Sequence, residues 1–163
     1  MIRRRSFAAV IPALALAGCG FELRRAPDFA FGKIFVNAAP ASQLGRDIKR
    51  AIASGNNVAV VTDPTKADVI LDLLTDQREK QVVGLNATGQ VREFQLRIRC
   101  RFRLRTREGR ELIPDAEILQ QRDISFTESA ALAKEDEEQL LYRDMQADIV
   151  LQLLRRIAAV KTI

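Results

Sequence analysis

The most constraining feature of the chain is the segment at residues 91–105, where apolar and polar side chains alternate without a break from residue 94. The even positions are apolar: Phe94, Leu96, Ile98, Cys100, Phe102 and Leu104. The odd positions carry Gln95 and five arginines: Arg97, Arg99, Arg101, Arg103 and Arg105. A period of two predicts a strand with one buried face and one open face. A strand of about 15 residues spans ~50 Å, which is longer than usual, so we expect an elongated sheet.

The remaining patterns predict the partners of this strand. A short strand is expected at residues 33–37, and longer ones at 69–83 and 116–126, while residues 58–61 form only a short apolar run. Ser42 is a candidate N-cap for a helix that ends near Gly55, and Thr127 to Ser129 are candidate caps for a helix at 132–159. We therefore predict an α+β domain, with a mostly antiparallel sheet of about four strands with long hairpins and two helices packed on one face.

Two details of the flanking strands follow from the same pattern. In the segment at 69–83, alternation predicts Val69, Leu71 and Leu73 on the buried face and Asp72, Asp76 and Arg78 on the open face. The segment at 116–126 alternates poorly, because Gln120 and Arg122 share the parity of Ile118 and Ile124. Either a bulge or an edge position accounts for this, and the sequence does not decide between them.

Composition excludes many kinds of catalysis. The chain has no histidine and two cysteines, so Ser-His-Asp catalysis, Cys-His catalysis, histidine-bearing zinc sites and four-cysteine clusters are ruled out. We predict neither an enzyme nor a metal site. The formal charge is +5, but it falls to +2 if positions 1–18, with Arg3, Arg4 and Arg5 and no acidic residue, are removed. A nucleic-acid binder is therefore not indicated.

The N-terminus has the form of an export signal. Three arginines precede an apolar run at residues 7–17, which is too short to span a bilayer and has the length of a signal-peptide core. Leu16, Ala17, Gly18 and Cys19 follow, and they resemble a bacterial lipobox. The resemblance implies cleavage between Gly18 and Cys19, with S-diacylglycerol and N-acyl lipid on Cys19 and no other cofactor. The alternative is an ordinary signal peptide with an incidental cysteine.

These segments give the predicted organisation of the chain. Residues 1–18 are a lipoprotein signal peptide, 19–32 a lipidated tether and 33–163 a single α+β domain. Gly20, by resemblance to enterobacterial sorting rules, favours lipid anchoring in the outer membrane after export through the inner membrane. Cys100 is then a lone thiol, which its strand position places on the apolar face.

The five arginines of the central strand permit two interpretations. Asp72 and Asp76 of the neighbouring strand can face them in cross-strand ion pairs. Alternatively, the guanidinium groups contact an anionic partner, either a protein surface or a lipid headgroup. Single-stranded RNA is excluded because Phe94 and Phe102 have the parity of the core.

Three segments carry a resemblance to a known family. Leu-Ala-Gly-Cys-Gly-Phe-Glu-Leu-Arg at 16–24, Gly-Gln at 89–90 before Glu-Phe-Gln-Leu at 93–96, and Ala-Leu-Ala-Lys-Glu at 131–135 resemble the LPS-assembly lipoprotein family LptE. The resemblance implies a non-enzymatic outer-membrane lipoprotein that plugs the β-barrel LptD, assists its assembly and binds lipopolysaccharide. The alternative is an accessory protein or scaffold of another envelope machine, such as barrel assembly.

The resemblance also implies where lipopolysaccharide binds. The family's binding lysine matches Lys134, while its second basic position is Ala87 here, for which Arg92 is a candidate substitute. The acidic run at 135–138 resembles a carboxylate cluster. We interpret it as negative charge that interacts favourably with the positive, N-terminal end of the helix dipole, rather than as a catalytic group.

Overall fold

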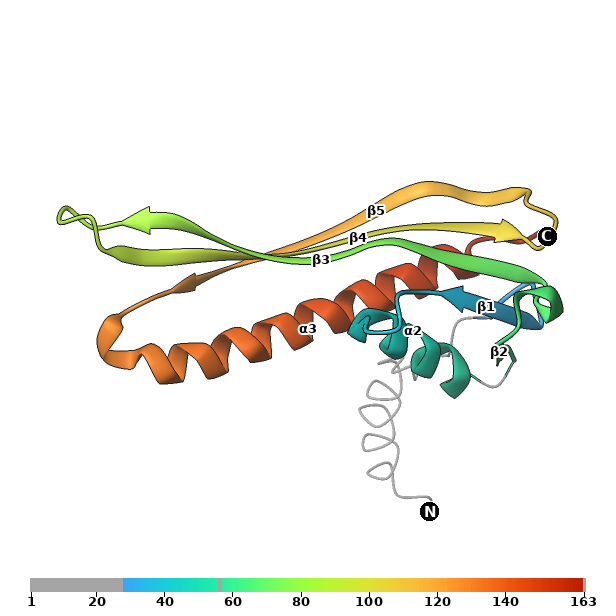
Figure 1. Ribbon diagram of the computed structural model, residues 1–163, viewed down its shortest axis with the longest axis horizontal. Coiled ribbons are helices and arrows are strands. Elements are labelled where there is room, and N and C mark those ends of the chain that lie inside the picture. The colour runs from blue at the N-terminus through green and yellow to red at the C-terminus, as the bar shows by residue number, and fades with distance from the viewer. Residues whose placement is uncertain (1–27, 56, 163) are drawn as a thin grey trace, which may run out of the picture.

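Three long strands form the body of the molecule, and both described helices pack on one side of them (Figure 1). The computed structural model describes residues 28–55 and 57–162. Within them the sheet has the order β2–β1–β3–β4–β5, formed by Ala59–Val61, Lys33–Asn37, Val69–Leu85, Val91–Thr106 and Glu111–Ser125. The predicted fold class is confirmed, although the sheet has five strands rather than about four. The short strands pair in parallel, and the long ladders β3–β4 and β4–β5 are antiparallel.

Strand β4 confirms the alternation that the sequence shows. Its even-numbered side chains from Leu96 to Leu104 are fully buried, while its odd-numbered arginines stay partly or well exposed. The strand lies inside the sheet because β3 and β5 pair with its two edges along most of its length. One face of the sheet therefore carries the core, and the face without helices carries the arginines.

A bulge in β3 overturns part of the predicted facing. The register shifts between Leu73 and Thr75, so that Asp72 lies opposite Arg103 but Asp76 lies opposite Cys100. Beyond this bulge the even-numbered side chains of β3 point toward the helices. The prediction that Asp76 and Arg78 share the open face with Asp72 is wrong, because one extra residue reverses the parity of the strand.

Strand β5 begins earlier than predicted, at Glu111, and forms an edge of the sheet. Its register is regular from Ala116 to Ser125, so an edge position, not a bulge, accounts for Gln120 and Arg122 on the buried face. A register shift does occur nearer its start, between the pairs Phe102–Ala116 and Leu104–Ile113. Pro114 lies within this shift, where a missing backbone donor costs little.

The two α-helices of the described residues are α2, at Gln43–Ser54, and α3, at Ala131–Ala158. Ser42 caps α2 as predicted, since its Oγ accepts a hydrogen bond from the backbone N–H of Gly45 at 2.8 Å. The predicted capping of α3 is wrong: a 3₁₀ turn at Glu128–Ala130 precedes it, and Thr127 makes no side-chain cap. Pro64–Lys66 forms another 3₁₀ turn before β3.

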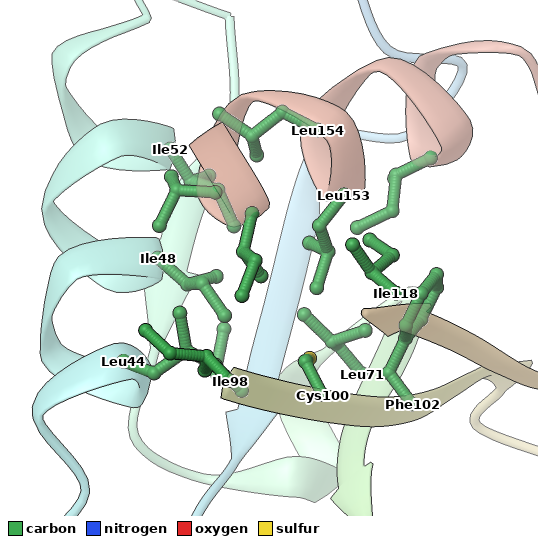
Figure 2. Close-up of a cluster of buried hydrophobic side chains, with 14 of the residues drawn as sticks. Leu44, Ile48, Ile52, Leu71, Ile98, Cys100, Phe102, Ile118, Leu153 and Leu154 are labelled. Atoms are coloured by element: carbon green, nitrogen blue, oxygen red, sulfur yellow. The ribbon is translucent and has the colours of Figure 1, made fainter. Parts of the chain in front are cut away.

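The core lies between the sheet and the helices. Figure 2 shows that α2, α3 and β4 contribute apolar side chains to one cluster: Leu44, Ile48 and Ile52 from α2, Leu153 and Leu154 from α3, and Ile98, Cys100 and Phe102 from β4. Helix α3 faces this core with apolar residues spaced four apart: Met145, Ile149, Leu153 and Ile157 are buried, and Leu141 packs against the cluster. Burying each large apolar side chain contributes roughly 1.5–3 kcal/mol, which fixes both helices on this one face.

The described chain begins inside the segment that was predicted as a tether. Phe31 is buried in the core, and Phe29 packs against it with its ring centroid 5.4 Å from that of Phe31. The packed domain therefore includes residues before Lys33, because burying two aromatic rings stabilises the folded chain. The predicted signal peptide, its predicted cleavage site and Cys19 lie outside the described residues.

Candidate functional site

The arginine ladder, defined as Arg97, Arg99, Arg101, Arg103 and Arg105, lies along the open face of β4. Within residues 28–55 and 57–162, four of its members pair with carboxylates of the neighbouring strands. Arg99 contacts Glu117 at 3.4 Å, and Arg101 pairs with Asp115 of the same strand β5. Arg97 donates instead to Gln95 Oε1 at 2.7 Å.

Asp72 of β3 binds the last two arginines of the ladder, Arg103 and Arg105. Its carboxylate is almost fully buried and accepts hydrogen bonds from Arg103 at 3.0 Å, Arg105 at 2.8 Å and Asn37 at 2.8 Å. Burial raises the pKa of Asp72, but the hydrogen bonds from Arg105, Asn37 and Arg103 outweigh it and hold the pKa below its ordinary value. Arg103 also lies 3.6 Å from Glu111.

These contacts favour the cross-strand interpretation of the ladder. The predicted pairing with Asp72 is present, whereas Asp76 lies on the other face, where it accepts a hydrogen bond from the Ser42 hydroxyl at 2.6 Å. A guanidinium group that already binds a carboxylate has fewer free hydrogen-bond donors for a second anion than an unpaired guanidinium group has. The ladder is therefore a polar, charge-balanced surface rather than a strongly basic one.

Lys134, the residue that matches the family's binding lysine, lies in the first turn of α3. Its Nζ is 2.8 Å from Glu137 Oε2 and donates to Ser125 Oγ at 3.1 Å. The side chain is only about one-fifth exposed, because it lies between the helix and the end of β5. An anionic ligand can bind this ammonium group by replacing Glu137.

Arg92 is exposed at the start of β4, next to the hairpin turn that contains Ala87. Its backbone carbonyl accepts a hydrogen bond from the N–H of Phe126 at 2.8 Å. Because Lys134 contacts Ser125, the two predicted ligand residues both border the end of β5. Arg92 also lines a hollow of about 220 Å³ with residues 127–129.

Lys80 is a third cation at this end of the molecule, and the sequence pattern did not predict it there. Its Nζ lies 2.6 Å from Glu138 of α3 and 4.3 Å from the ring centroid of Phe94. Lys80 and Lys134 line the same small cavity of about 60 Å³. Only the reversed parity beyond the β3 bulge brings Lys80 to the helix side, so strict alternation could not have found it.

The acidic run at 135–138 has a different role from the one predicted. The first turn of α3 contains no acidic residue, and the effect of the helix dipole falls off within that turn. Glu137 instead pairs with Lys134, three residues earlier on the same helix, and Glu138 pairs with Lys80 of β3.

A further prediction concerns the thiol of Cys100. Cys100 is fully buried, as its parity predicted, and burial raises the pKa of its thiol to about 12. Among the described residues, no three acidic or cysteine side chains are grouped so that they could hold a metal ion. No described helix combines the length and apolar character needed to cross a membrane.

Comparison with known proteins supplies a family. Residues 31–157 match the model of the family described as LptE, lipopolysaccharide-assembly. A Yersinia enterocolitica protein named LPS-assembly lipoprotein LptE is 28% identical over 156 residues, spanning 90% of this chain and 72% of the relative. Lipoprotein B of Nitrosomonas europaea is 35% identical, with a TM-score of 0.76 over 86% of this chain and 91% of that one. Rare lipoprotein B of Shewanella oneidensis shares the fold at 24% identity, with a TM-score of 0.66 over 78% of this chain and 95% of that one.

Proposed function

The chain belongs to the LptE family of lipopolysaccharide-assembly lipoproteins of the outer membrane, and from this membership we propose three molecular roles for it. It is anchored to the outer membrane through lipid on Cys19, it occupies and supports the β-barrel LptD, and it binds lipopolysaccharide on its way to the outer leaflet. The role is binding and assembly rather than catalysis. The observation that carries the proposal is the family match over nearly the whole described domain.

Lipid anchoring rests on the lipobox-like residues before Cys19. Two or more acyl chains give stable membrane attachment, since each buried CH₂ contributes about 0.8 kcal/mol. Labelling with radioactive palmitate tests this step. We expect label on the protein, loss of label in Cys19→Ala, and full label in the matched Cys100→Ala variant. Label that persists in Cys19→Ala would refute the anchor.

The shape of the domain supports a place inside a barrel. Helix α3 has 28 residues and spans about 42 Å, and β3 has 17 residues and spans about 56 Å along the same direction (Figure 1). The lumen of an outer-membrane barrel is polar. A long, narrow module whose open face carries paired charges, such as the arginine ladder, suits such a lumen better than an apolar face would.

Affinity purification from solubilised membranes tests the choice of partner. The proposal expects a large β-barrel at 1:1 stoichiometry with the tagged chain. Recovery of barrel-assembly components without LptD would favour the alternative role as an accessory protein of another envelope machine.

Lipopolysaccharide carries phosphates and carboxylates, which bind ammonium and guanidinium groups through charge-assisted hydrogen bonds. The cluster of Lys80, Arg92 and Lys134 is the surface that we propose for this contact. We expect Lys134→Asp to weaken capture of lipopolysaccharide in a pull-down while the domain stays folded. Lys49→Asp, an exposed lysine on α2, is the matched control, and equal capture by the two variants would refute the role of Lys134.

A further inference from the structure

A groove between α2 and α3 lies apart from the cluster just described. It has a volume of about 890 Å³ and is lined mainly by residues of the two helices. This volume falls within the range of about 300–1,000 Å³ that is typical of ligand sites. Its apolar lining comprises Ala51, Ala147, Val150 and Leu151, of which Leu151 is 39% exposed although it is a large apolar side chain.

Three arginines border the apolar lining: Arg50 of α2, Arg78 of β3 and Arg143 of α3. Across the part of the chain that the structure describes, Arg78 and Arg143 form no ion pair. Arg78 donates to the buried Gln146 and lies 5.3 Å from the Tyr142 ring centroid, while Arg143 donates to the Gln139 carbonyl at 3.3 Å.

The groove contains one carboxylate, and it is already engaged. Asp47 pairs with Arg50 and also accepts a hydrogen bond from Gln146. Among the lining residues, positive charge therefore exceeds negative charge, next to an apolar surface. This combination is complementary to a molecule that joins an acyl chain to a phosphate group.

We infer that the groove holds the acylated, phosphorylated end of lipopolysaccharide, with acyl carbon against Leu151 and Val150 and phosphate against Arg78 and Arg143. The inference rests on the proposed function and adds to it a contact distinct from Lys134. A protein segment is the less suitable occupant, because a stable protein interface buries about 800 Å² on each side and the apolar lining here is only four residues.

Binding of lipopolysaccharide by the purified full chain tests the phosphate contact. Arg143→Glu should weaken binding by about tenfold or more, since it reverses a charge at a charge-assisted contact. The matched control is Arg155→Glu, because Arg155 donates to the Leu151 carbonyl at the same distance of 3.3 Å but lies outside the groove. Equal binding by the two variants, with binding by Lys134→Asp still impaired, would overturn the inference that the groove binds lipopolysaccharide. The proposed function would then still stand.

A second pair of variants tests the acyl contact. Leu151→Asp should weaken binding of intact lipopolysaccharide but not of deacylated lipopolysaccharide, and Leu140→Asp, exposed on α3 outside the groove, should change neither. An equal effect of Leu151→Asp on both ligands would overturn the inference. Loss of LptD co-purification in Leu151→Asp with unchanged lipopolysaccharide binding would also overturn it, since the occupant would then be protein. Failure of the unmodified chain to bind lipopolysaccharide would overturn the inference and the proposed lipopolysaccharide contact together.

Discussion

Replacing Asp72 with alanine is the sharpest test of how the open sheet face is built. The change removes the acceptor of three hydrogen bonds, from Asn37, Arg103 and Arg105. Removing one partner of a buried ion pair typically costs about 3–5 kcal/mol. The two arginine side chains are 36% and 28% exposed and can regain water, so we expect a loss of about 2–4 kcal/mol in the free energy of unfolding.

Urea unfolding at neutral pH measures this loss, and Glu117→Ala is the matched control. Glu117 pairs with Arg99 of the same ladder, but both side chains are more than one-third exposed, so that loss should stay below about 1 kcal/mol. Equal effects of the two variants would refute the conclusion that Asp72 is the structural anchor of the ladder.

The pH dependence of the Asp72 effect has a definite sign. The pKa of Asp72 in the folded chain lies below its ordinary value, so its contribution to stability is present above pH of about 4 and is lost as pH falls through the folded-state pKa. The difference between the original chain and Asp72→Ala should therefore narrow in acid. A difference that widens in acid would contradict the assignment.

Three further predictions concern the core and the cap of α2. Phe102→Ala should cost about 3–5 kcal/mol in urea unfolding, because the ring is fully buried, and a loss below about 1 kcal/mol would contradict its central place. Cys100, with a buried thiol whose pKa is raised to about 12, should not react with a thiol reagent at pH 8 until denaturant is added; rapid reaction of the folded protein would show the burial to be wrong. Ser42→Ala should cost about 1 kcal/mol, since it removes the cap on Gly45 and the hydrogen bond to Asp76, and unchanged thermal stability would refute the capping role.

The parts of the fold that could be predicted are those set by local periodicity. Strand β4 alternates without interruption, and the stripe at Met145, Ile149 and Leu153 repeats every four residues, so each element shows which face it buries. The parallel pairing of the three-residue strand β2 with β1 was not predictable, because it depends on the path that the chain takes after the end of α2.

The parts of the site that could not be predicted depend on the β3 bulge. Leu73 and Leu74 are consecutive apolar residues, and they interrupt the alternation of β3. From this pair alone the sequence does not show which face of the sheet each later residue occupies. Lys80 and Arg78 reach the helix side only because of this extra residue. Lys134 was found through family resemblance, since a lysine near a helix start is by itself an ordinary surface residue.

Depletion of the protein in living cells tests the central claim most directly, with lipopolysaccharide at the cell surface and the folded state of LptD measured together. The account predicts that surface lipopolysaccharide falls and that LptD misfolds, while other outer-membrane barrels fold normally. Unchanged surface lipopolysaccharide, or an equal folding defect in all barrels, would contradict it.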